Sequence, residues 1–401
     1  MRVAVLGAGI QGSCLALELA ARGVDVDLYD RAPRCLTGAS VNCEGKIHLG
    51  FVYAADPSLR TARRLVEGAF AFSRNMRRWI GDAIDALPRS RAIHYLIHRD
   101  SMVPRDKVEA YFAAIHDLHL EAVGDGADYF GKRFERPPLA LPDPAEAGYD
   151  RDRTSAVYET EEVALHTRPV AEVLRARVQA EPRVRLRMQT TVKGVARNGR
   201  LQVSAERDGQ ALEESYDQVV NALWDGRIAV DATMGLEPRH PWLFRYKEFM
   251  WLERPEPAPT PSTTVVLGPF GDVIHYPDGV VLSWYPEGRR LVTDAVEPPG
   301  ADELLARRDP ALAKAAMMDG LAELMPGLET LRADALERAE LRGGWIYARG
   351  ATDIDDAASG LHERHAVGPQ SFDGYHTVDT GKYTLAPLFA MQLADRIAPL
   401  N

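Results

Sequence analysis

The sequence predicts an α/β fold with two domains. One is built on a parallel sheet, and the second is an α+β domain that contains a mixed or antiparallel sheet. Residues 2–29 have the pattern of a strand, a helix and a strand, which requires a parallel pair with a right-handed crossover. Residues 244–293 hold short strand-like runs between Gly and Pro turns, which favours antiparallel strands. The 401 residues suffice for two or three domains, and 46% of them are apolar, which indicates a globular protein.

The first strand–helix–strand unit follows from local signals. Residues 2–7 form an apolar run that ends in glycine, which predicts a buried strand. Residues 11–22 carry apolar side chains at helical spacing, and Gly23 follows as a C-terminal cap. Residues 24–29 alternate between polar and apolar side chains, which predicts a second strand that ends at Asp30.

Proline and glycine mark most of the remaining boundaries. Asp56 and Pro57 predict the start of a helix that runs to about residue 80, and Pro104 predicts one to about residue 120. We further expect helices over 169–180, 302–325 and 385–397. Strands are expected over 184–188, 190–195, 201–205, 217–222, 249–252, 263–267, 280–284 and 290–293. An exposed loop is expected over 255–261, and another loop before the last helix.

Charge and cysteine content argue against several classes of protein. The 48 Lys and Arg against 58 Asp and Glu give a net charge of −10 and no basic block, so we expect no nucleic-acid partner. No apolar run reaches the ~20 residues of a membrane helix, so we expect no membrane span. Cys14, Cys35 and Cys43 cannot pair off and lack metal-ligand spacing, so we expect no metal site and a cytoplasmic location.

A glycine loop joins the first strand to the first helix. It reads Gly7-Ala-Gly9-Ile-Gln-Gly12, and Asp30 stands at the end of the next strand, as in a Rossmann-like dinucleotide-binding domain. Gly7 would permit the tight turn, Gly9 the approach of a pyrophosphate, and Gly12 the close packing of helix on strand. Asp30 would accept hydrogen bonds from a ribose. Because NAD and FAD both use such a loop, the motif leaves the two cofactors open.

Two further segments resemble one family. Thr37-Gly-Ala-Ser40, then Asn42 and Glu44-Gly-Lys-Ile-His-Leu-Gly-Phe-Val-Tyr53, resemble the D-amino-acid-oxidase-like (DAO) superfamily of FAD-dependent oxidoreductases, and within it most nearly the L-2-hydroxyglutarate oxidases. Thr380-Gly-Lys-Tyr-Thr-Leu-Ala-Pro387 looks like the closing flavin segment of that superfamily. The run Asn221-Ala-Leu-Trp-Asp-Gly226 departs from its usual Ala-Thr-Gly turn.

The resemblance implies FAD, which we expect to be held non-covalently, although some members of the superfamily link the flavin through Cys or His. Both flavin-facing segments lie near the ends of the chain, so we expect an FAD-binding domain from residues 1–50, 155–235 and 340–401 and a substrate domain from 51–154 and 236–339. We expect the cofactor to contact Gly7, Gly9, Ile10, Gln11, Gly12, Asp30, Arg31, Ser40, Asn42, Gly45, Lys46, Ile47, Val192, Gly381, Lys382, Tyr383 and Thr384.

Three side chains are candidates for catalysis. His48 would take the proton of a substrate hydroxyl, or else hydrogen-bond the flavin or the backbone in a structural role. Arg364 would clamp a substrate carboxylate with its planar fork, or else pair with Glu363. Lys382 would place a positive charge at the flavin N1–C2=O edge and favour reduction.

We therefore expect an FAD-dependent oxidase or dehydrogenase that oxidises a CH–OH or CH–NH group of a small, polar, carboxylated molecule by hydride transfer to flavin N5. Dioxygen or another acceptor would then take the electrons. One alternative is a flavin-dependent monooxygenase, although its C-terminal Gly-Asp-Ala-x-His element is absent after residue 340. Another is a non-catalytic flavoprotein subunit.

Overall fold

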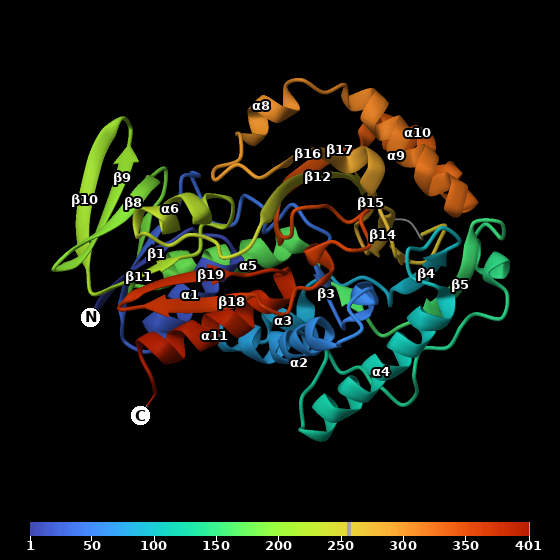
Figure 1. Ribbon diagram of the computed structural model, residues 1–401, viewed down its shortest axis with the longest axis horizontal. Coiled ribbons are helices and arrows are strands. Elements are labelled where there is room, and N and C mark those ends of the chain that lie inside the picture. The colour runs from blue at the N-terminus through green and yellow to red at the C-terminus, as the bar shows by residue number, and fades with distance from the viewer. Residues whose placement is uncertain (255–257, 401) are drawn as a thin grey trace.

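A six-stranded sheet gathers strands from distant parts of the chain (Figure 1). We describe a computed structural model that covers residues 1–254 and 258–400. Five of the six strands are parallel and the edge strand β18 is antiparallel to β19. In spatial order the strands are β18 (Gly368–Phe372), β19 (Tyr375–Asp379), β11 (Gln218–Asn221), β1 (Arg2–Leu6), β2 (Asp25–Tyr29) and β7 (Val184–Arg187).

The two faces of this sheet are covered differently. Alternate side chains of β1 point to opposite faces. Val3 and Val5 belong to the core shared with the helices, whereas Ala4 and Leu6 pack with a three-stranded antiparallel sheet. The covering elements are α1 (Ile10–Ala21), α2 (Arg60–Ile80), α5 (Thr167–Ala180) and α11 (Ala386–Ile397) on one face, and β8 (Thr191–Asn198), β9 (Arg200–Arg207), β10 (Gln210–Tyr216) and α6 (Arg227–Thr233) on the other.

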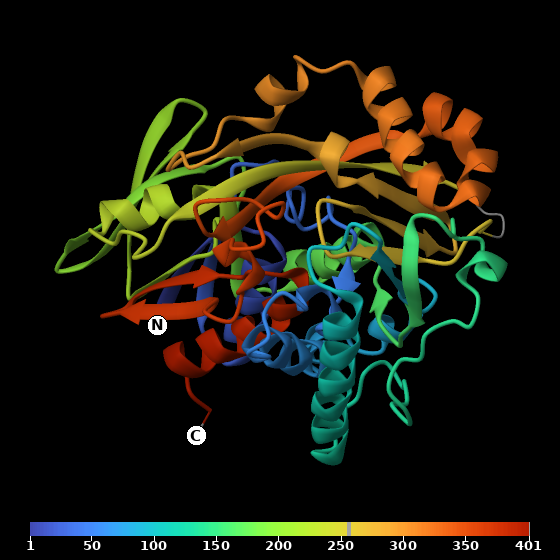
Figure 2. The same cartoon turned by 45° about the vertical axis from the view of Figure 1, so that its right-hand side comes forward.

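A second, eight-stranded sheet is mixed, because β13 runs parallel to β4 while the other pairs are antiparallel. Short helices lie over its outer face (Figure 2). The strands are β16 (Arg289–Thr293), β12 (Trp242–Glu253), β15 (Gly279–Trp284), β14 (Gly271–Tyr276), β13 (Thr263–Val266), β4 (His94–His98) and β5 (Thr154–Glu159), with β17 (Glu340–Arg349) on β12; the helices are α8 (Ala301–Leu305), α9 (Pro310–Leu324) and α10 (Arg332–Arg338).

Smaller elements connect the two sheets. A two-stranded antiparallel pair, β3 (Lys46–Ile47) and β6 (Val163–Ala164), lies next to the site described below. The remaining α-helices of the described residues are α3 (Ala83–Ala86), α4 (Arg105–Gly124) and α7 (Tyr285–Gly288). Within the described ranges, no helix combines the length and apolar character needed to cross a membrane.

The predicted α/β fold class is confirmed, but three element predictions were wrong. The helix expected over 302–325 is split into α8 and α9, because Pro310 starts a new helix on the side-chain cap of Asp309. The helix expected from Pro57 begins at Arg60, and the Asp56 carboxylate accepts the N–H of Thr61 at 3.2 Å. The loop expected before the last helix contains the β18–β19 hairpin.

The division into domains stays a prediction. All six strands of the first sheet come from the ranges 1–50, 155–235 and 340–401. Two of the predicted boundaries, however, fall on strands of the eight-stranded sheet, since β5 spans residue 155 and β17 begins at residue 340. The loop expected over 255–261 lies partly outside the described residues, which omit 255–257.

Candidate active site

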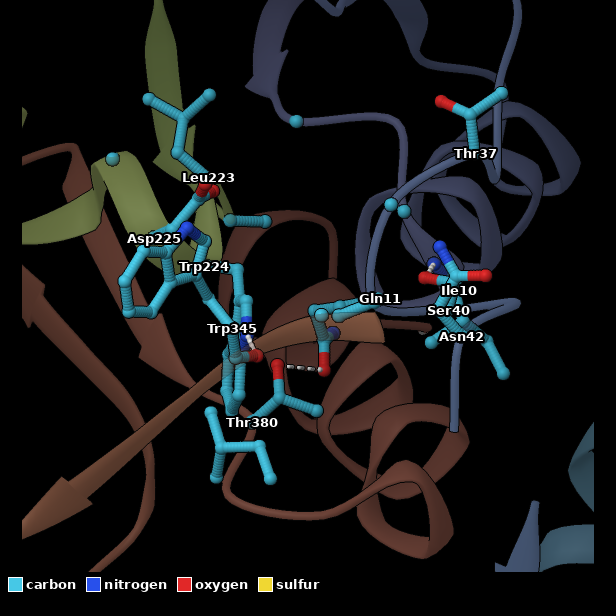
Figure 3. Close-up of a pocket in the computed structure, with 18 of the residues that line it drawn as sticks. Ile10, Gln11, Thr37, Ser40, Asn42, Leu223, Trp224, Asp225, Trp345 and Thr380 are labelled. Atoms are coloured by element: carbon cyan, nitrogen blue, oxygen red, sulfur yellow. Dashed lines mark hydrogen bonds between the residues drawn. The ribbon is translucent and has the colours of Figure 1, made fainter. Parts of the chain in front are cut away.

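A cavity of about 400 Å³ lies at the carboxyl ends of the parallel strands, and residues of β12 and β17 also line it. Figure 3 shows part of its lining. Gly7, Asp30, Ala222 and Thr380 each come directly after one of the parallel strands and line the cavity. Ligands of open parallel sheets bind at this edge. The predicted cofactor contacts that line the cavity are Gly7, Gly9, Ile10, Gln11, Asp30, Arg31, Ser40, Asn42, Gly45, Lys46, Val192, Gly381, Lys382 and Tyr383.

Three predicted contacts, Gly12, Ile47 and Thr384, lie behind the cavity wall. A Cβ on Gly12 would come within 1.9 Å of the Gly7 carbonyl oxygen, so Gly12 allows the close packing of α1 on β1. Ile47 is fully buried in β3. Thr384 holds the backbone of β3 through its hydroxyl. All three support the wall rather than forming its surface.

The glycine loop is shaped for a ligand to approach its backbone. Gly7 has a φ of +101°, and a Cβ there would lie 2.5 Å from the Ala222 carbonyl oxygen. Gly9 faces Ser40, whose hydroxyl accepts the N–H of Ile10 at 2.9 Å. The N-terminus of α1 and the Thr37–Ser40 segment therefore share one wall of the cavity.

Asp30 organises one end of the cavity. Its two carboxylate oxygens accept backbone N–H groups, from Ala8 at 2.8 Å and from Ala32 at 2.9 Å, so it shapes the glycine loop. Burial raises the pKa of Asp30. Next to it, Arg31 pairs with Asp225 at 2.5 Å. This ion pair joins the ends of β2 and β11 beside the cavity.

Asp225 belongs to the run 221–226 that departs from the family pattern. In this run Trp224 has a left-handed φ of +59° and donates its indole N–H to the carbonyl of Trp345 at 2.7 Å. Both indoles line the cavity (Figure 3). The larger turn thus adds an aromatic wall and connects β11 to β17.

His48 lines the other half of the cavity and is 5% exposed. Its backbone N–H donates to the Thr384 hydroxyl at 3.0 Å, and its Nδ1 lies 3.3 Å from Glu162 Oε1. This separation is within ion-pair range, but the two groups are not aligned as in a hydrogen bond. Burial lowers the pKa of His48 despite the nearby carboxylate, so the ring is neutral at neutral pH.

Three cations lie near the buried phenol of Tyr53, which does not itself line the cavity. Lys382 lines the cavity, with Nζ 5.7 Å from the centre of the Tyr53 ring. Burial lowers the pKa of Lys382. Burial alone would raise the pKa of Tyr53, but the charges of Lys382, Arg364 and Arg245 lower it.

Arg364 is 6% exposed and does not line the cavity. Its Nη1 donates to the carbonyl oxygens of Gly381 at 3.1 Å and Tyr347 at 3.4 Å. Glu363, the alternative partner expected from the sequence, instead approaches Arg60 at 3.9 Å. In this structure the guanidinium holds the closing segment from behind, and its role as a carboxylate clamp stays a prediction.

Lys46 lies in a chain of alternating charges that sequence reasoning missed. Lys46 Nζ donates to Asp272 Oδ1 at 2.5 Å and to the Thr264 hydroxyl at 3.0 Å. Lys247 pairs with Glu44 and lies 3.5 Å from Asp272 Oδ2. Only one sign of this chain of charges is present in the sequence, which is that Lys247 and Asp272 are charged residues within largely apolar strands. The pairs themselves could not be inferred, because the partners are more than 200 positions apart.

Comparison with known proteins decides the family. The model of the DAO family, described as FAD dependent oxidoreductase, matches residues 2–396. The chain belongs to this family. It is therefore an FAD-dependent oxidoreductase, which confirms the predicted cofactor and the prediction of an enzyme.

Solved structures of similar fold agree with this assignment. Glycine oxidase from Geobacillus kaustophilus has a TM-score of 0.65 and 14% identity over 98% of this chain and 94% of its own. Iminodiacetate oxidase from Chelativorans sp. BNC1 has a TM-score of 0.64 and 17% identity over 99% and 95%. L-α-glycerophosphate oxidase from Mycoplasma pneumoniae, with FAD bound, has a TM-score of 0.62 and 14% identity over 100% and 95%.

One curated relative matches over a short segment. It is the tRNA 5-methylaminomethyl-2-thiouridine biosynthesis bifunctional protein MnmC of Saccharophagus degradans, which is 35% identical over 85 residues. These residues make up 21% of this chain and 12% of that protein. The match is too short to extend that protein's activity to this FAD-dependent oxidoreductase.

The residues that line the cavity have the chemistry needed to bind FAD. Gln11 lines it and has a buried side-chain N–H₂ group without a partner among the described residues. A helix N-terminus with a glycine loop suits the pyrophosphate, and Asp30 and Arg31 stand where a ribose would follow. At the far end, residues 381–383 and His48 would adjoin the isoalloxazine ring, whose N5 accepts a hydride when FAD is bound.

Proposed function

We propose that this FAD-dependent oxidoreductase oxidises a CH–OH or CH–NH group of a small, anionic molecule and passes the electrons to dioxygen or another acceptor. The observation that carries the proposal is the arrangement of His48 and Lys382 in one half of the cavity. A neutral imidazole there can accept a proton, and an ammonium group can bind an anion. No carboxylate within the described residues forms an ion pair with Lys382.

The charge of the pocket supports an anionic substrate. The protein as a whole has a net charge of −10, which repels anions at long range. Lys382, Arg364 and Arg245 concentrate positive charge around Tyr53, and among them Arg245 is neutralised by Asp353 at 2.9 Å. A substrate carboxylate next to Lys382 would therefore gain a charge-assisted hydrogen bond of about 1.5–3 kcal/mol.

The resemblance to L-2-hydroxyglutarate oxidases makes 2-hydroxy acids the first candidates. The solved structures of similar fold are named for glycine, iminodiacetate and L-α-glycerophosphate, which are also small and carry an anionic group. A 2-hydroxy acid requires a base for its hydroxyl proton, and His48 suits that task. An amine substrate would lose its hydride as the neutral amine and would need no such base.

The test is anaerobic bleaching of the FAD-loaded protein. The compounds to screen are 2-hydroxy acids, D- and L-amino acids, N-methyl amines and glycerophosphates, each with an uncharged ester or amide as its counterpart. We expect an anionic compound to bleach the flavin and its uncharged counterpart to fail. Consumption of NADPH without bleaching by any compound would instead favour the monooxygenase.

A matched pair of variants then tests the role of Lys382. Lys382→Met removes the charge at similar length and should raise the KM of the bleaching compound at least ~10-fold, which corresponds to about 1.4 kcal/mol. Lys107→Met removes an exposed lysine of α4 and should leave KM unchanged. An unchanged KM in Lys382→Met would contradict the anion site.

A further inference from the structure

Strand register places a carboxylate opposite the candidate base. In the antiparallel pair β3–β6, Lys46 stands opposite Ala164 and Ile47 opposite Val163. The same register, continued by one residue, brings His48 opposite Glu162. Their side chains meet, with Nδ1 of the imidazole 3.3 Å from Oε1 of the carboxylate. The pairing is therefore a consequence of backbone geometry and not of a flexible surface contact.

Glu162 is held as a charged group. Its side chain is fully buried, and burial alone would raise its pKa. Its Oε2 accepts the N–H of Leu49 at 2.7 Å, and its Oε1 accepts the hydroxyl proton of Tyr95 at 2.7 Å. The nearby His48 imidazole, the charge of Lys46 and the hydroxyl of Tyr95 outweigh burial and lower the pKa of Glu162 below its usual value.

An ionised carboxylate 3.3 Å from Nδ1 favours, through its negative charge, the tautomer that carries a proton on that nitrogen. Because it only accepts hydrogen bonds, the neutral His48 ring is favoured with its proton on Nδ1, facing Oε1. The lone pair then lies on Nε2, across the ring. His48 lines the cavity and Glu162 does not, so the ring stands between the carboxylate and the space that a substrate would enter.

We propose that Glu162 is a positioning residue that keeps the proton of His48 on Nδ1 and leaves Nε2 free to take the proton of a substrate hydroxyl. This inference rests on the proposed oxidation of a CH–OH group. In that step the O–H bond breaks and its proton moves to Nε2. FAD, when bound, would supply the acceptor for the hydride of the C–H bond on the same carbon, so that the product is a carbonyl compound.

The primary test is a measurement on His48 itself. FAD-loaded protein labelled with ¹⁵N only in histidine reports both the tautomer and the pKa of each ring by NMR, and His48→Asn identifies the signal by its loss. We expect the wild-type ring to carry its proton on Nδ1. In Glu162→Gln the pKa of His48 should fall by about one unit or more, because an opposite charge within ~4–6 Å is removed.

A matched control lies one residue away. Glu161 is half-exposed and pairs with Lys132 at 2.9 Å, so Glu161→Gln removes the same charge from the surface and should leave the His48 titration unchanged. Glu162→Asp keeps the charge and should retain the Nδ1 tautomer, which provides a test if Glu162→Gln fails to fold. A wild-type ring protonated on Nε2, or a His48 pKa that Glu162→Gln leaves in place, would overturn the inference.

Kinetics distinguish this inference from the proposed function. With a 2-hydroxy acid that bleaches the flavin, the rate of reduction should rise with pH through the pKa of His48. Glu162→Gln should shift that rise to lower pH and reduce the maximal rate at least ~10-fold, whereas a purely structural defect would lower the rate without moving the rise. If a compound bleaches the flavin but Glu162→Gln leaves the pH profile of the reduction rate in place, the positioning role is refuted and the proposed function stands. If no compound bleaches the flavin, the proposed function itself is refuted.

Discussion

The hydroxyl oxygen of Thr384 accepts a hydrogen bond of 3.0 Å from the backbone N–H of His48, 336 positions earlier in the chain. The same hydroxyl donates to the carbonyl of Lys46 at 3.1 Å. One buried side chain therefore fixes the strand that carries the candidate base to the segment that closes the cavity.

Thr384→Val should separate these two segments. The substitution is nearly isosteric, but it leaves a buried N–H and a buried carbonyl without a partner, at a cost of about 1–3 kcal/mol each. We expect the free energy of unfolding to fall by about 2 kcal/mol and FAD to bind more weakly, as measured by urea titration and fluorescence. Thr384→Ser keeps the hydroxyl and should behave like wild type; equal losses in both variants would refute this role.

Gly12→Ala should abolish FAD binding. A methyl group at this position would lie 1.9 Å from the carbonyl oxygen of Gly7 and would push α1 away from the glycine loop. Gly124→Ala is the matched control, since its methyl group meets open space at the end of α4 and should be neutral or slightly stabilising. The measurement is bound flavin per protein after gel filtration, and full occupancy in Gly12→Ala would contradict the packing.

Arg364→Lys tests the position of the hydrogen-bond donor rather than the charge. A lysine cannot reach the carbonyls of Gly381 and Tyr347 with the same geometry, so residues 381–383 should lose their position at the cavity. We expect FAD to remain bound and flavin reduction to slow at least ~10-fold, about 1.4 kcal/mol in the barrier. Arg60→Lys changes an exposed arginine and should reduce at the normal rate. A normal rate in Arg364→Lys would show that no catalytic geometry depends on Arg364.

FAD should leave the protein completely on acid precipitation. Cys43 lines the cavity, but burial raises the pKa of its thiol to about 12, so almost no thiolate is present to attack a flavin. Yellow colour in the pellet would indicate a covalent link, and Cys43→Ser would then show whether Cys43 is the point of attachment.

His119 should make stability depend on pH. Its ring is buried beside Phe51 and Phe134, and its Nε2–H donates to the Leu49 carbonyl at 2.9 Å. Burial lowers its pKa from 6.5 to about 4. Between these values the unfolded chain binds a proton that the folded chain does not, so stability is full above pH 6.5 and is lost as the pH falls toward 4.

The measurement is urea unfolding of wild type and His119→Gln at several pH values from 7 to 4.5. We expect His119→Gln to be less stable than wild type at pH 7. Its free energy of unfolding should, however, change less steeply with pH, by up to ~1.4 kcal/mol per pH unit, because one titrating group is gone. Parallel slopes in the two proteins would show that His119 does not titrate in this range.

Sequence reasoning succeeded where the determinants are local. The glycine loop, the helix after it and Asp30 lie within one short segment, and each carries a residue-specific signal. The pairing of His48 with Glu162 had no such signal, because β3 and β6 are two residues long and show no periodicity. Partners that meet only through tertiary register are not visible in a single sequence.

The missed hairpin is a different case, because its signal was present. Asp373 and Gly374 both have positive φ, of +46° and +85°, as a tight two-residue turn requires. Asp-Gly is a strong hairpin dipeptide, and it stands directly between β18 and β19. The many His and Gly residues before this segment favoured the prediction of a loop, although the Asp-Gly turn was itself sufficient to predict a hairpin.

Residues within 7–48 and residues 380–383 both line the cavity, so the cavity is complete only after both segments have been synthesised. Thr384 leaves the ribosome 336 residues after His48, which at ~5–20 residues per second is a delay of roughly 20 to 70 seconds. Throughout this time the nascent chain has its glycine loop but lacks β19 and the last wall of the cavity. We therefore expect flavin capture to be a late step of biogenesis, and we expect a chain that terminates before residue 380 to bind no cofactor.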